Sequence, residues 1–167
     1  MPPKRILVVD DVSVIRGFVK GALKHLDVRV GEASNAEQAL VMLESMPADV
    51  IICDLNMPGL SGEAFVKALR ERGDQTPIIM LTVEGNRNTV AKLMQVGIQG
   101  YMLKPFKPMI LAERVQELLD GTAPPVRPYE APANTADTAA EADAPPPDDT
   151  AVNDAPTASA ESTGARG

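Results

Sequence analysis

The chain has 167 residues, which is enough for one ordinary domain with an appendage. Hydrophobic residues make up 44% of it and aromatic residues only 3%, and the net charge is -7. Residues 121–167 contain eight acidic residues and two arginines, so residues 1–120 are close to neutral. This balance argues against a basic surface for nucleic acid.

The number of cysteines and the lengths of the apolar runs indicate where in the cell the protein is expected to be. A single cysteine, Cys53, excludes a disulfide within one chain, and a cytoplasmic location is the natural expectation. The N-terminal stretch MPPKRILVVD contains an apolar run far too short for a signal peptide. No run of 18 apolar residues occurs, so we expect no membrane insertion.

Five short apolar runs have the length and composition of β-strands. The third, VIIC, is typical of a strand that is buried on both faces. Segments with helical periodicity separate the runs, and this alternation predicts an α/β fold, a doubly wound parallel sheet covered by five helices on its two faces. The predicted strands are Arg5–Val9, Val28–Ala33, Val50–Cys53, Ile78–Leu81 and Gly100–Leu103.

The segments between the strands repeat apolar residues every three or four positions, as helices do. Ser34 and Glu37 predict a capping box at the start of the second helix. Gly97 predicts the end of the fourth helix, and Pro108 the first turn of the fifth, which lacks a Ser or Thr cap. The apolar positions are Val14, Phe18, Ala22 and Leu26; Ala36, Leu40 and Leu43; Ala64, Phe65, Ala68 and Leu69; Val90, Ala91, Leu93 and Met94; and Leu111, Val115 and Leu118.

After Asp120 the composition changes abruptly to alanine, proline, aspartate and threonine. Such a segment buries too little apolar surface to offset the entropy of ordering it. We therefore expect a folded domain over residues 1–120 and a disordered acidic tail over residues 121–167, with no DNA-binding output domain.

Polar residues stand at the ends of four of the five predicted strands. Asp10 and Asp11 follow the first strand, Asp54 the third, Thr82 the fourth and Lys104 the fifth. All strands of a parallel sheet point the same way, so these side chains meet at one edge, where ligands bind in open α/β sheets. Each residue alone has a simple structural explanation, such as a helix cap or a solvated charge, but five at one edge indicate a functional site.

The charges of this set suggest its chemistry. Three neighbouring carboxylates repel one another and are tolerable around a hard divalent cation, for which Mg²⁺ is suited. Asp54 then lies where a carboxylate nucleophile could form an aspartyl phosphate, with Lys104 and Thr82 placed to contact the phosphoryl oxygens.

With these residues placed, the chain resembles a response-regulator receiver domain over about residues 4–120, of the single-domain type found in chemotaxis. The motifs that carry the resemblance are VVDD at 8–11, DLNMPG at 54–59, LT at 81–82 and GYMLKPF at 100–106. Together they are highly specific. The resemblance implies a flavodoxin-like sheet with strand order 2-1-3-4-5.

The resemblance also assigns roles to individual residues. It implies that Asp54 is the phosphoacceptor, and that Asp11, Asp54 and the backbone carbonyl of Asn56 bind Mg²⁺, with Asp10 acting through water. It further implies that Thr82 and Lys104 contact the phosphoryl group and that Thr82 forms a switch pair with Tyr101. The bond between Lys104 and Pro105 is expected to be cis.

Three positions near Asp54 are expected to tune the site. Val83 stands where this family usually has Ala or Gly, and its branched side chain is expected to narrow the approach to Asp54. Glu84 and Asn56 are polar neighbours that in similar receivers help water attack the phosphoryl group. Leu55 follows the acceptor where chemotaxis proteins often carry an aromatic residue.

The resemblance implies partners rather than an independent catalytic activity. A sensor histidine kinase or phosphotransfer protein would donate the phosphoryl group, and the chain, a monomer or weak dimer, would assist its own phosphorylation and dephosphorylation. A downstream effector protein would bind an output surface on the fourth helix, fifth strand and fifth helix, which comprises Arg87, Val90, Met94, Tyr101 and Arg114.

Two alternatives compete with this interpretation. A haloacid-dehalogenase-type phosphatase also uses an aspartate after a strand, but it needs a second aspartate two residues later, where this chain has Asn56. A localisation or scaffold protein would instead recruit partners through its tail, with the receiver gating that recruitment.

Overall fold

The computed structural model describes residues 1–122, and the expectation of a disordered tail falls almost entirely outside them. Strands and helices alternate along the chain, and the strands form one parallel sheet in the order β2-β1-β3-β4-β5. The predicted fold class and strand order are confirmed. The strands are β1 (Lys4–Val9), β2 (Val28–Ala33), β3 (Val50–Asp54), β4 (Ile78–Thr82) and β5 (Gly100–Leu103).

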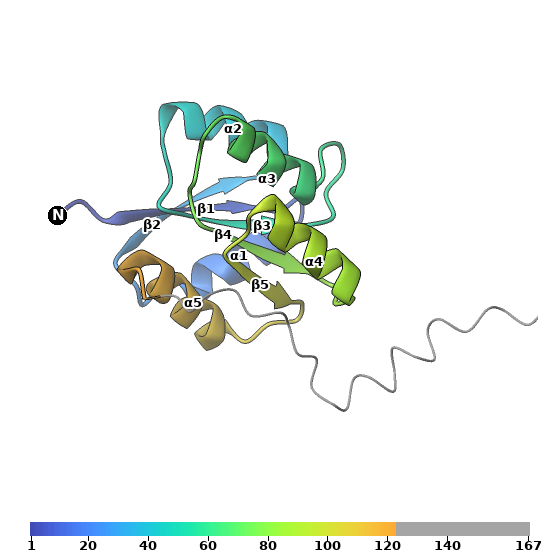
Figure 1. The fold of residues 1–167 in the computed structure, drawn as a ribbon. Coiled ribbons are helices and arrows are strands. Elements are labelled where there is room, and N and C mark those ends of the chain that lie inside the picture. The colour runs from blue at the N-terminus through green and yellow to red at the C-terminus, as the bar shows by residue number, and fades with distance from the viewer. Residues whose placement is uncertain (123–167) are drawn as a thin grey trace, which may run out of the picture. The chain divides into compact units, whose positions relative to one another are not determined.

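Within residues 1–122, five helices cover the two faces of the sheet (Figure 1). Helices α2, α3 and α4 pack on one face around Phe65, and α1 and α5 pack on the other around Leu111. The helices are α1 (Ser13–Ala22), α2 (Ala36–Ser45), α3 (Gly62–Glu71), α4 (Arg87–Val96) and α5 (Pro108–Asp120).

The burial of each strand follows its place in the sheet. Strands β3 and β4 are central, and every residue in both is buried. Strands β2 and β5 lie at the two edges and are mostly half-buried. A strand covered by helices on both faces and by strands on both sides needs an unbroken apolar run, which explains the VIIC and IIML segments.

The ends of the helices are explained by the residues at those ends, and one of the three predictions about them is wrong. Gly97 adopts the left-handed conformation that ends α4, and Pro108 begins α5, as predicted. The N-cap of α2 is Asn35, one residue later than predicted. Asn35, not Ser34, accepts the hydrogen bond from the Gln38 backbone N–H, and Gln38 rather than Glu37 reaches back to the Ser34 N–H. Asparagine and serine cap equally well, so composition alone does not choose between neighbours.

The predicted apolar face of the first helix is partly wrong, although Ala22 is buried as predicted. Val14 and Phe18 are 75% and 48% exposed, whereas Val19 and Leu23 are buried. Helix α1 carries two apolar stripes, and its contacts with β1 and α5 place only one of them against the sheet. Leu26 falls in the turn beyond the helix, which ends at Ala22.

Arg70 joins the ends of several elements far from the strand termini that carry the acidic residues. Its guanidinium donates to the carbonyls of Asp74, Thr76 and Gly97 at 2.7–3.1 Å and to the side chain of Gln99 at 3.2 Å. These bonds link the C-terminal ends of α3 and α4 with the start of β4. Within residues 1–122 no helix has the length and apolar character to cross a bilayer.

Candidate functional site

Three carboxylates meet at the C-terminal ends of β1 and β3. Each of Asp10, Asp11 and Asp54 places a carboxylate oxygen within 4.8 Å of the other two. Asp10 and Asp54 are buried, whereas Asp11 is exposed. The chain leaves β1 in one direction for β2 and returns on the other side to β3, and this reversal opens the crevice in which the carboxylates lie.

Lys104 closes the site from the end of β5. Its ammonium lies 3.0 Å from Asp10 Oδ2 and 3.2 Å from Asp54 Oδ1. Burial alone would lower the pKa of Lys104, but the hydrogen bond and charge of Asp10 together with the charge of Asp54 raise it above its usual value. The peptide bond between Lys104 and Pro105 is cis, as expected.

The charge on Asp54 is balanced by opposing influences. Burial raises the pKa of its carboxyl above the usual value, Lys104 opposes the rise, and the negative charge of Asp10 adds to it. One ammonium neutralises only part of the negative charge of three carboxylates. The site therefore has an excess of negative charge that a cation would offset.

Asp10 is held by Val12, the residue before α1, and by Arg16 of α1. The Val12 N–H donates to Asp10 Oδ1 at 2.9 Å, and Arg16 donates to the Asp10 carbonyl at 2.6 Å. Arg16 also pairs with Glu32 on β2 at 3.2 Å. Sequence reasoning missed Arg16. The only sequence feature that could have indicated its role is its position, as a cationic residue one turn into the helix that follows Asp10 and Asp11.

Gly62, at the start of α3, allows the chain to pass close behind Asp54. A methyl group added at Gly62 would lie 2.2 Å from the Asp54 carbonyl oxygen and 2.9 Å from the Leu55 Cα. The Gly62 N–H also donates to the Leu55 carbonyl at 2.8 Å. Sequence reasoning missed this residue too, although a glycine soon after an acceptor loop is a signal for close backbone approach.

The loop after β4 connects the residues expected to switch. Glu84 contacts both of them and also Asn56: its N–H donates to Thr82 Oγ1 at 3.0 Å, its carbonyl accepts from the Tyr101 hydroxyl, and its carboxylate accepts from the Asn56 amide at 3.3 Å. Thr82 is fully buried and Tyr101 half-buried. The predicted pair Thr82 and Tyr101 thus lies on either side of one loop residue.

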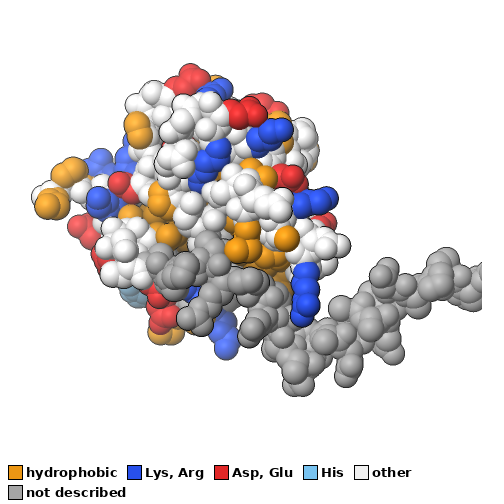
Figure 2. Space-filling view, in the orientation of Figure 1, with side chains coloured by type: hydrophobic (Ala, Val, Ile, Leu, Met, Phe, Trp, Pro, Cys, Tyr) orange, Lys and Arg blue, Asp and Glu red, His pale blue; other side chains and the backbone are white. Residues whose placement is uncertain are grey.

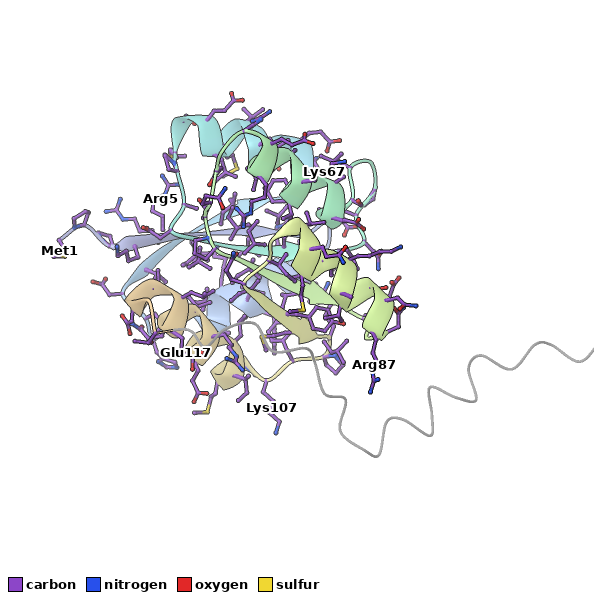
Figure 3. The ribbon with its side chains drawn as sticks, viewed as in Figure 1. Met1, Arg5, Lys67, Arg87, Lys107 and Glu117 are labelled. Atoms are coloured by element: carbon purple, nitrogen blue, oxygen red, sulfur yellow. The ribbon has the colours of Figure 1, made fainter. Side chains whose placement is uncertain are left out.

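The expected output surface is partly wrong. Val90 is 5% exposed and packs inside the domain, because it lies on the face of α4 that turns toward the sheet. Arg87 and Arg114 are exposed, and Met94 is half-buried. Figure 2 shows hydrophobic side chains gathered on the face where α4 and β5 lie, and Figure 3 shows Arg87 pointing away from the start of α4.

Val83 is 70% exposed beside the buried Thr82. Its side chain makes no part of the core, so it is free to influence access rather than stability. Its expected effect on the approach to Asp54 stays a prediction.

The residues present fit a magnesium ion. The candidate ligands are carboxylate oxygens, which hard divalent cations prefer, and they retain excess negative charge beyond what Lys104 neutralises. The exposure of Asp11 leaves one side of the cluster open to water, which Mg²⁺ usually keeps in its coordination shell.

Comparisons with known proteins all indicate the same protein family. The model of the response regulator receiver domain matches residues 6–116. The chemotaxis protein CheY of Pseudomonas aeruginosa is 35% identical over 119 residues, covering 70% of this chain and 96% of that protein. The chemotaxis protein CheY-3 of Vibrio cholerae is 34% identical, covering 70% and 92%.

Comparison with solved structures indicates the same family. The chemotaxis protein CheY4 of Vibrio cholerae, crystallised at low pH, superimposes with a TM-score of 0.66 at 36% identity, covering 70% of this chain and 99% of that one. The receiver domain of the Francisella response regulator 1452 gives a TM-score of 0.68 at 29% identity, covering 71% and 98%. This chain belongs to the response-regulator receiver domain family.

Proposed function

We propose that this receiver is a phosphorylation switch of two-component signalling. A sensor histidine kinase or phosphotransfer protein would donate a phosphoryl group to Asp54, and the loaded domain would present an altered surface to an effector protein. The observation that supports this most directly is the placement of Asp54, buried at a strand end and 3.2 Å from the ammonium of Lys104.

The chemistry assigned to the chain's own residues is nucleophilic attack and charge neutralisation. An Asp54 carboxylate oxygen would attack the phosphorus of a phosphohistidine, forming an O–P bond as the P–N bond breaks, and the imidazole leaves with a proton from solvent. Lys104 favours the charged carboxylate and lies where it can pair with the phosphoryl oxygens. The protein in this proposal assists its own modification rather than acting on other molecules.

A magnesium ion would contribute charge neutralisation at the transferring group when bound. Asp11, Asp54 and the Asn56 carbonyl would hold it, with Asp10 acting through water.

The signal would leave through the loop that contains Glu84. A phosphoryl oxygen on Asp54 offers the Thr82 hydroxyl a new acceptor, and Thr82 already accepts a hydrogen bond from the Glu84 N–H. Movement of Thr82 would shift this loop and with it Tyr101, whose hydroxyl donates to the Glu84 carbonyl. Such couplings are commonly about 1–3 kcal/mol.

The effector surface would include Tyr101, Met94, Arg87 and Arg114 on α4, β5 and α5. Two similar proteins are chemotaxis proteins, and we infer motility control as the pathway to test first.

The deciding experiment measures covalent phosphorylation by acetyl phosphate and intact mass. The wild type should gain one phosphoryl group in the presence of Mg²⁺ and none in EDTA, and Asp54→Asn should gain none. Asp49→Asn, which removes an exposed carboxylate elsewhere, should load normally. Labelling that persists in Asp54→Asn would contradict the assignment of the acceptor.

A second variant separates loading from switching. Thr82→Ala should load but show no phosphorylation-dependent change in the amide spectra of α4 and β5. The same spectral change in Thr82→Ala and wild type would remove Thr82 from the proposed relay.

A further inference from the structure

Two arginines lie side by side at the opposite end of the sheet from Asp54. Arg5 on β1 and Arg29 on β2 are direct partners in the parallel register. Side chains alternate along a strand, so Arg5 shares its face with Leu7 and Val9, which pack under α2. Figure 3 labels Arg5 where β1 begins, far from Arg87 at the start of α4.

The pair lines a pocket of about 210 Å³ at this end of the sheet. The other lining residues are Val30 and Gly31 of β2 and Met46, which follows α2. Gly31 adds no side chain to fill the space, while Met46 and Val30 supply apolar surface. The pocket is smaller than the usual site for a drug-sized ligand, which suits a compact group.

Neither guanidinium has a hydrogen bond or ion pair to another residue among residues 1–122. In the same part of the chain Arg16, Arg70, Arg72 and Arg114 all have such partners. Asp49 comes near, but its carboxylate accepts from the Arg5 backbone N–H at 2.7 Å and lies 3.7 Å from the Lys4 ammonium. Arg5 and Arg29 therefore share one face of the sheet and one pocket without a counter-ion from the described residues 1–122.

Like charges directly opposite on neighbouring strands are unfavourable. A ligand with two negative charges would remove this repulsion, and guanidinium groups match the geometry of phosphate oxygens with paired N–H donors. We propose that Arg5 and Arg29, with the pocket they line, bind a small anion bearing a phosphate group.

This site is separate from the acceptor site and independent of the proposed phosphorylation. Five residue steps of extended chain, roughly 16 Å, separate Arg5 from Asp10, which follows the other end of β1. Failure of one assignment would leave the other standing, because Asp54 loading requires neither arginine.

The test titrates the full chain with inorganic phosphate, and separately with glycerol phosphate, at constant ionic strength in EDTA. The ¹H–¹⁵N spectra should show saturable shifts at the Val30 and Gly31 amides and at the Nε–H groups of Arg5 and Arg29. Arg29→Gln should weaken binding about tenfold or more, since charge-assisted hydrogen bonds are lost. Arg29→Lys, which keeps the charge but not the paired donors, should be intermediate.

Lys67→Gln is the charge-matched control, since it removes one exposed positive charge on α3, outside both proposed sites, and should leave the affinity unchanged. Shifts that stay linear with concentration, that are equal in Arg29→Gln, or that fall only on Thr82 and Lys104 would overturn the proposal. Saturation by a hexaglutamate peptide but not by either phosphate compound would also overturn it and would indicate an acidic protein segment as the occupant.

Discussion

Asp54 combines a buried position with a charge that burial disfavours, and its neighbours determine whether that charge is tolerated. Lys104 neutralises part of it, and Asp10 works against that neutralisation. Such opposed influences are typical of functional sites, where reactivity is maintained at some expense of stability. The residues around Asp54 therefore divide into those that affect its charge and those that affect its position or access.

Gly62 affects position. Gly62→Ala should destabilise the domain by about 1–3 kcal/mol and slow acetyl-phosphate loading, because the new methyl group would displace the Asp54 and Leu55 backbone. Thermal unfolding and intact-mass time courses measure the two effects. Gly17→Ala, on the open surface of α1, should instead stabilise the domain by about 0.5–1 kcal/mol. An unchanged melting temperature in Gly62→Ala would show that the acceptor loop moves aside freely.

Val83 affects access. Val83→Ala should speed acetyl-phosphate loading by up to about tenfold, equivalent to about 1.4 kcal/mol of barrier, because the stiff branched side chain beside Thr82 is shortened. Its 70% exposure means that the melting temperature should hardly change. Loading that is unchanged or slower would exclude the steric effect. The hydrogen bond between Asn56 and Glu84 is expected to influence phosphoryl lifetime more than loading.

At the scale of elements, helix α4 is held differently at its two ends. Its C-terminal end is tied to α3 and β4 through Arg70 and the left-handed Gly97. Its N-terminal end follows the loop after β4, in which Glu84 contacts Thr82 at the end of β4 and Asn56 near the acceptor. Movement of that loop should therefore change the N-terminal part of α4 more than its C-terminal part.

Arg70→Met should destabilise the domain by about 2–4 kcal/mol, because three backbone carbonyls lose charged donors while the apolar stem is kept. Denaturant unfolding measures the loss. Arg72→Met is the matched control on the same helix end: its exposed pair with Glu44 should contribute less than about 1 kcal/mol. Equal effects in the two variants would refute the joining role of Arg70.

At the scale of the whole molecule, the acidic site links metal binding to folding. Saturating Mg²⁺ should raise the stability of the wild type, by about 2.7 kcal/mol at about 100 times the Kd, because the unfolded chain does not hold the three carboxylates together. Thermal unfolding in Mg²⁺ and in EDTA measures the difference. Asp11→Asn should reduce it, and Asp49→Asn should not.

Lys104→Met tests the same balance of charge at the acidic site by removing its positive charge. Without its ammonium the metal-free domain should melt lower, and the rise in melting temperature with Mg²⁺ should be larger, because the carboxylates lose their only described cationic partner. A smaller rise with Mg²⁺ in Lys104→Met would mean that the lysine helps to shape the metal site rather than competing with the ion.

Much of this protein could be read from its sequence, because the relevant signals are local. Apolar runs of strand length, helical periodicity and residues such as Gly97 and Pro108 determined the elements and their approximate ends. The placement of Asp10, Asp11, Asp54, Thr82 and Lys104 at one edge followed from a general property of parallel sheets, that their C-terminal ends coincide.

Only the tertiary structure decided which faces are buried and which side chains meet. Two apolar stripes on α1 look alike in sequence, yet only packing against β1 and α5 buries Val19 and exposes Phe18. Val90 belongs both to the predicted apolar face of the fourth helix and to the expected output surface, and only the packing of α4 shows that it is buried. The contacts of Gly62, Arg70 and the paired Arg5 and Arg29 join residues far apart in the chain. Their energies depend on distances that exist only once the elements have packed, because local sequence sets a segment's conformation and not its neighbours.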